Sequence, residues 1–110
     1  MPKTFDVDAL ISELELDQED IVELFDDFKE FIEETMPELK KSIESSDMGK
    51  ARSQSHSIKG SAGNLRINEV YEISKRMQDE AENSDSSGLE ADYVKLEAAV
   101  AEFLEELTSL

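Results

Sequence analysis

The chain has 110 residues, which is the length of one domain with a single modest core. Its 38% hydrophobic and 35% charged residues indicate a folded domain, and its net charge of −17 disfavours nucleic acid and anionic membranes as partners. Cysteine is absent, which excludes disulfides, thiol catalysis and cysteine-ligated metals.

Turn signals in the first half of the chain separate two predicted helices. A short helix is expected over residues 6–15. Asp17 is a good N-cap for a long helix over residues 18–45, where apolar residues recur every three or four positions. Pro37 interrupts this pattern and predicts a kink, or two abutting helices, rather than a loop.

The second half of the chain predicts three more helices. Asp47 and Asn68 are expected to be N-caps, and residues 84–88 form a polar loop. The helices are expected over residues 48–65, 68–83 and 89–107. Short connections between long amphipathic helices indicate an all-α fold. We expect one domain over residues 1–110, an antiparallel, up-down four-helix bundle with a short N-terminal capping helix.

The predicted helix over residues 48–65 carries one histidine on its exposed side. At about 100° per residue, five positions of this helix share one face and form a buried stripe. That stripe consists of Ala51, Ser55, Ile58, Ala62 and Leu65. His56 points roughly 140° away from it, so we expect this side chain at the surface or at the edge of a groove.

Two glycines follow His56 on the same helix. Gly60 lies one turn further along and Gly63 two turns further along. Each glycine inside a helix costs about 1 kcal/mol relative to alanine. We interpret both as positions without side chains that let a bulky partner approach the imidazole closely.

Residues 48–66 form a positive segment in an acidic chain, with no Asp or Glu. Its basic residues are Lys50, Arg52, Lys59 and Arg66. Lys59 and Arg52 flank His56, and a group with about two negative charges, such as a phosphoryl group, would be tolerated there. The ordinary alternative is that Lys50, Arg52 and Arg66 form ion pairs with nearby acids.

A helical hairpin brings one more side chain toward His56. If the helices over residues 48–65 and 68–83 turn about Ile67, residues equidistant from Ile67 lie level with each other. His56 precedes Ile67 by eleven positions and Gln78 follows it by eleven. We therefore expect Gln78 to hydrogen-bond the imidazole or a group attached to it.

The segment beginning at His56 reads HSIKGSAGNL. It resembles the histidine-containing phosphotransfer (HPt) domain of multistep phosphorelays. The family pattern is a histidine, a Lys-Gly pair three residues later and a further glycine, which here are His56, Lys59, Gly60 and Gly63. The resemblance covers the whole chain in length and helix order.

The resemblance implies a role for each residue of this site. His56 would accept a phosphoryl group, and Lys59 would steady the phosphoryl oxygens. Gln78 would orient the imidazole, and Gly60 and Gly63 would clear room for the partner.

The resemblance also implies the partners of such a carrier. A neutral imidazole, a good nucleophile near pH 7, would attack the phosphorus of a receiver's aspartyl phosphate in line and later pass the group to another receiver. The partners would be response-regulator receiver domains and a hybrid sensor histidine kinase. The receiver would supply the aspartate and Mg²⁺, so we expect no cofactor or metal on this chain, which would act as a monomer.

Other chemistries find no motif in this sequence. The order of glycines and lysine after His56 is not a P-loop, so we expect a phosphocarrier rather than an enzyme with its own ATP site. One histidine cannot form a histidine-rich zinc site. Two alternatives stay open: a helical adaptor that is never phosphorylated, and the phosphoacceptor domain of a chemotaxis-type histidine kinase.

Two features of the sequence bear on location and completeness. No apolar run approaches the ~20 residues of a membrane span, and the N-terminus lacks a signal-peptide pattern, so we expect a cytoplasmic protein. The initiator-like Met1 and the amphipathic segment ending at Leu110 favour a free-standing protein.

Overall fold

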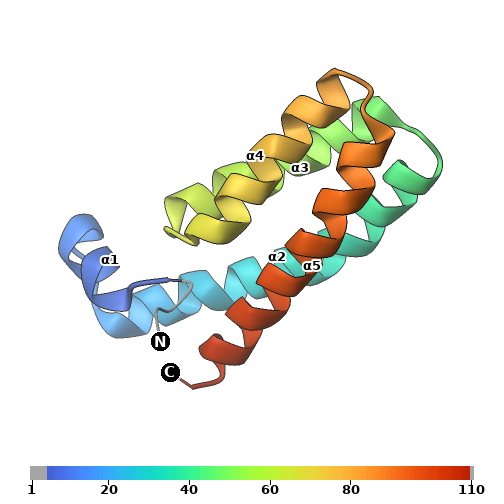
Figure 1. The fold of residues 1–110 in the computed structure, drawn as a ribbon. Coiled ribbons are helices and arrows are strands. Elements are labelled where there is room, and N and C mark those ends of the chain that lie inside the picture. The colour runs from blue at the N-terminus through green and yellow to red at the C-terminus, as the bar shows by residue number, and fades with distance from the viewer. Residues whose placement is uncertain (1–4, 110) are drawn as a thin grey trace.

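The computed structural model describes residues 5–109, which form five α-helices and no strand (Figure 1). The helices are α1 (Val7–Leu14), α2 (Gln18–Glu44), α3 (Met48–Asn64), α4 (Asn68–Glu82) and α5 (Ser86–Leu107). The prediction of an all-α fold is therefore confirmed. Met1 and Leu110, on which the expectation of a free-standing protein rests, lie outside the described residues.

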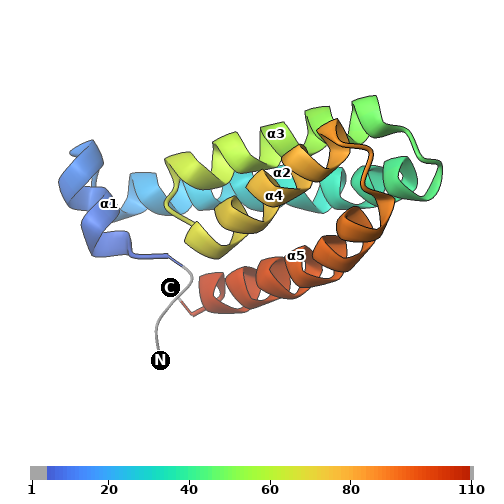
Figure 2. The same cartoon turned by 45° about the horizontal axis from the view of Figure 1, so that its top comes forward.

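Four of the helices pack around a common core. α3 contacts α2 and α4, and α5 contacts α4 and α2, so these four helices close a ring of contacts. Figures 1 and 2 both show α3 and α4 side by side, with α1 at the end of the molecule where α2 begins. α1 packs on α2. α3 and α4 are thus neighbours in the bundle, and each also contacts one of the two longer helices, α2 and α5.

A cluster of phenylalanines fixes the N-terminal segment to the bundle. The ring of Phe5 lies 4.6 Å from that of Phe25 on α2 and 5.5 Å from that of Phe103 on α5. Phe28 meets Phe103 edge to face at 5.4 Å. All four side chains are buried, and large aromatic rings supply much of the apolar area that such a small core buries.

Aspartate caps explain where two of the helices begin. The side chain of Asp17 accepts a hydrogen bond from the backbone N–H of Asp20 at 2.9 Å, and α2 begins one residue after Asp17. Asp47 accepts from the backbone N–H of Lys50 at 3.1 Å and caps α3 in the same way. Both predicted caps are confirmed.

The structure corrects two other predicted boundaries. Ile67 occupies the N-cap position of α4 and makes no side-chain capping bond, so Asn68 is the first helical residue rather than the cap. α5 begins at Ser86, not at residue 89, because Asp85 caps it by accepting from the backbone N–H of Gly88 at 3.0 Å. Most of the predicted polar loop is therefore the first turn of a helix.

Pro37 lies inside α2 without ending it. The helix is continuous from Gln18 to Glu44, so the alternative of two abutting helices is wrong. A proline removes the hydrogen bond to the carbonyl four residues earlier, here that of Glu33. Both residues are exposed, so water can satisfy that carbonyl from outside the bundle.

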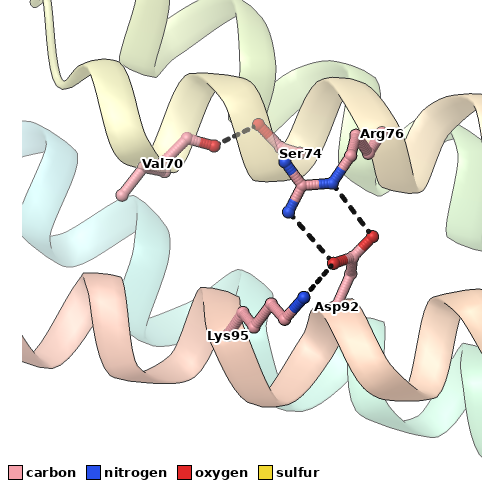
Figure 3. Close-up of polar contacts among 5 residues, drawn as sticks. All are labelled: Val70, Ser74, Arg76, Asp92 and Lys95. Atoms are coloured by element: carbon pink, nitrogen blue, oxygen red, sulfur yellow. Dashed lines mark hydrogen bonds and ion pairs between the residues drawn. The ribbon is translucent and has the colours of Figure 1, made fainter.

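A buried carboxylate joins α4 to α5 (Figure 3). Asp92 is 5% exposed and accepts two hydrogen bonds from Arg76, from Nη2 at 3.0 Å and from Nε at 3.3 Å. The ammonium group of Lys95 lies 3.9 Å from the same carboxylate. Pairing with two cations compensates for the burial of this charge.

Glu80 lies beside this cluster on α4. Among the residues that the structure describes, its Oε1 is buried without a hydrogen-bond partner. Burial, a hydrogen bond with Asp92 and the negative charges of Asp92 and Asp85 raise the pKa of Glu80 from 4.5 to about 7, against a smaller opposing effect of Arg76. Between these two values the folded protein keeps a proton that the unfolded chain has lost, so the stability contributed by Glu80 falls as pH rises.

Replacing Glu80 by glutamine should remove this loss of stability with rising pH. We expect the free energy of unfolding of Glu80→Gln to rise relative to wild type by about 1 kcal/mol between about pH 5 and pH 8, after allowing for solvent screening. Urea unfolding at both pH values measures the change. Asp79→Asn, which removes an exposed carboxylate from the same helix, is the control. A difference for Glu80→Gln that does not vary with pH would contradict this account.

Candidate functional site

The corner between α3 and α4 sets how the two helices face each other. Arg66 adopts the left-handed conformation, with φ 57°, directly after the last turn of α3. The backbone N–H of Ile67 donates to the carbonyl of Ala62 at 2.9 Å, and that of Arg66 donates to the carbonyl of Gly63 at 3.2 Å. This pair of bonds is a Schellman motif, which ends one helix and fixes the direction of the next. Ile67 itself is fully buried.

His56 is exposed on α3 and faces α4 through one ring nitrogen. Its Nδ1 lies 3.4 Å from Oε1 of Gln78. The residues predicted for the opposite face of α3, Ala51, Ser55, Ile58, Ala62 and Leu65, are all buried. The structure therefore brings His56 and Gln78 together as the equidistance from Ile67 predicts.

The next level of the same hairpin holds an ion pair. Nε of Arg52 donates to Oε1 of Glu82 at 2.8 Å, and both side chains are exposed. The pKa of Glu82 lies below its ordinary value, first because of this hydrogen bond and also because of the charge of Arg52. Glu82 was not among the residues predicted for the site. Arg52 and Glu82 are also equidistant from Ile67, so the pairing rule that pointed to Gln78 could have found it.

The positive segment of α3 is partly neutralised by its neighbours. Arg66 pairs with Glu13 of α1 at 2.9 Å, as Arg52 pairs with Glu82 of α4. The alternative of pairing with nearby acids is thus confirmed for these two arginines. Lys59 is half-buried and takes part in none of the ion pairs found between residues 5 and 109. Its charge makes a small contribution to lowering the pKa of Glu82.

The two glycines of the motif have different surroundings. Gly60 is exposed, and a Cβ atom added there would meet nothing within 4 Å. A Cβ atom added at Gly63 would lie 3.2 Å from Cδ2 of Tyr71 on α4. The missing side chain of Gly63 thus makes room for the Tyr71 ring, a packing role that sequence reasoning did not identify. The predicted role of Gly63 in partner access stays a prediction. Gly60 remains the open position beside His56.

Within residues 5–109, no group of three or more His, Cys, Asp or Glu side chains is arranged to hold a metal ion. No described helix combines the length and the apolar character needed to cross a bilayer.

Comparisons with known proteins agree on one family. The Hpt domain family model matches residues 23–109. This range includes most of α2 and the whole of α3, α4 and α5. The phosphorelay intermediate protein rdeA of Dictyostelium discoideum is 33% identical over 100 residues, which are 91% of this chain and 39% of that protein. The chain thus spans well under half the length of this relative. No solved structure gives a significant match.

The different surroundings of the glycines predict different effects of alanine. Gly60→Ala should raise the free energy of unfolding by about 1 kcal/mol, because alanine is the better helix former and the added methyl group meets open space. Gly63→Ala should gain less, or lose stability, because the Tyr71 ring must shift. Urea unfolding of both variants decides the matter. Equal gains at the two positions would show that Gly63 is not packed against α4.

Proposed function

The chain belongs to the Hpt domain family, and on this premise we propose that its phosphotransfer in a two-component phosphorelay passes through His56. The observation that carries the proposal is the setting of this imidazole. It is exposed on a helix, one ring nitrogen faces Gln78, and no hydrogen bond of the other nitrogen is found within residues 5–109. An exposed nucleophile suits a partner that brings its own active site.

The contact with Gln78 selects the reacting nitrogen. An amide oxygen can only accept a hydrogen bond, so the contact requires the ring hydrogen on Nδ1 and leaves the lone pair on Nε2. Nε2 attacks the phosphorus of an aspartyl phosphate, an N–P bond forms, and the P–O bond breaks as the carboxylate leaves with the bonding electrons. The phosphorylated ring is cationic, which strengthens the bond from Nδ1 to Gln78. The reverse step passes the group to another receiver.

The neighbours of His56 supply charge and space. Lys59, one turn along α3, binds phosphoryl oxygens and offsets their charge. Gly60 leaves the surface open, so that the receiver's aspartate approaches Nε2 in line. Arg52 flanks the site from the preceding turn. We expect the receiver to bind the Mg²⁺ ion that the transfer requires.

The family also suggests the setting in which the carrier works. We place it in the cytoplasm as a monomer, between the receiver of a hybrid sensor histidine kinase and a response-regulator receiver. It has no ATP site of its own and acts as a carrier, not as a kinase. We also propose that α2–α5 are arranged as an antiparallel, up-down four-helix bundle and that α1 caps one end of it.

Transfer from a phosphorylated receiver domain tests the proposed function. Wild-type protein should acquire an acid-labile, base-stable label, and His56→Gln should acquire none because the chain has no other histidine. Urea unfolding of both proteins controls for the fold, since an exposed side chain is exchanged.

Two outcomes would favour the alternatives. Unchanged labelling of His56→Gln, or no labelling of wild type by any receiver of the same genome, would support an adaptor bundle. Labelling that requires only an ATP-binding kinase domain, with no receiver, would support the phosphoacceptor domain of a chemotaxis-type kinase.

A further inference from the structure

Glu82 lies among the side chains that a phosphoryl group on His56 would need. Its carboxylate accepts the hydrogen bond from Nε of Arg52 at 2.8 Å. A hydrogen bond from Gln78 and the charge of Lys59 act on the same carboxylate. A negatively charged group therefore already occupies the positive side of this site.

The helical spacing places Glu82 one turn away from the level of His56. Arg52 precedes His56 by one turn on α3, and Glu82 follows Gln78 by one turn on α4. Side chains one turn apart are about 5–6 Å from each other at Cβ. With His56 against Gln78 and Arg52 against Glu82, the four side chains form two neighbouring levels of one exposed face.

A phosphoryl group and the Glu82 carboxylate would compete at this face. Both are anions, and both prefer the guanidinium of Arg52 as a hydrogen-bond donor. A phosphoryl group carries about two negative charges, so it is repelled by Glu82 while it attracts Arg52. Both partners of the ion pair are exposed and long, which allows Arg52 to change its acceptor without any movement of the backbone.

We propose that Glu82 holds Arg52 while His56 is unmodified, and that the phosphoryl group on His56 takes Arg52 from it. This inference rests on the proposed function and concerns the regulation of that site. Glu82 then disfavours the phosphorylated state of the carrier and shifts the equilibrium toward the receiver. With this carboxylate present, the site is a better donor of the phosphoryl group than a site with Arg52 and Lys59 and no acid beside them.

The chain offers a matched control for a merely structural ion pair. Arg66 and Glu13 pair at 2.9 Å, and their side chains are 47% and 48% exposed, against 54% and 43% for Arg52 and Glu82. Exposed pairs of this kind contribute little to stability. Glu13→Gln removes the same charge and the same kind of contact near the far end of α3.

The experiment measures how label divides between the carrier and a receiver domain at equilibrium. Glu82→Gln should raise the ratio of phosphorylated carrier to phosphorylated receiver roughly two- to fivefold, the size of an exposed charge interaction. Glu13→Gln should leave that ratio at the wild-type value. A ratio for Glu82→Gln equal to that of wild type, or a rise for Glu13→Gln of the same size, would overturn the proposal.

A second measurement follows Arg52 directly and needs no receiver. Phosphoramidate, a small-molecule donor, phosphorylates histidine chemically, and the Nε–H resonance of Arg52 in ¹⁵N NMR reports its acceptor. That resonance should shift on phosphorylation, while the Nε–H resonance of Arg66 stays in place. An unmoved Arg52 resonance in fully phosphorylated protein would overturn the inference alone, whereas failure of every receiver to label the chain would contradict the proposed function.

Discussion

The register of α3 against α4 is the constraint on which the site depends. It is set by a corner whose backbone hydrogen bonds reverse the chain and whose Ile67 side chain is fully buried. Once this corner is fixed, His56 meets Gln78 and, one turn away, Arg52 meets Glu82. A slip of one turn would separate both pairs at the same time. The buried side of the hairpin thus positions the side chains of the proposed site on its exposed side.

Charge is distributed so that α3 receives its acidic partners from other helices. The chain carries a net charge of −17, yet residues 48–66 contain no acid, and their arginines pair with Glu13 and Glu82. Where a carboxylate is instead buried, as Asp92 is, paired cations hold it and it joins α4 to α5.

Features that depend on one helix at a time were predictable from the sequence. The all-α class, the buried stripe of α3 and the Asp17 cap follow from local period and cap chemistry. The start of α5 was missed because Ser and Gly after Asp85 resemble a loop, although Asp85 caps a helix there. The packing of Gly63 depends on Tyr71, a residue of the facing helix α4. The helical period of α3 alone could not predict this contact between two helices. Proximity of His56 to Gln78 was predictable because it follows from the corner alone.

The identity of the phosphorylated nitrogen shows whether the contact with Gln78 selects Nε2 of His56. His56 is the only histidine, so protein labelled with ¹⁵N in its imidazole and phosphorylated by a receiver gives one unambiguous NMR signature. We expect coupling of ³¹P to Nε2, with the hydrogen of Nδ1 retained toward Gln78. Phosphorus on Nδ1, the nitrogen that faces α4, would contradict the proposed role of the hairpin register.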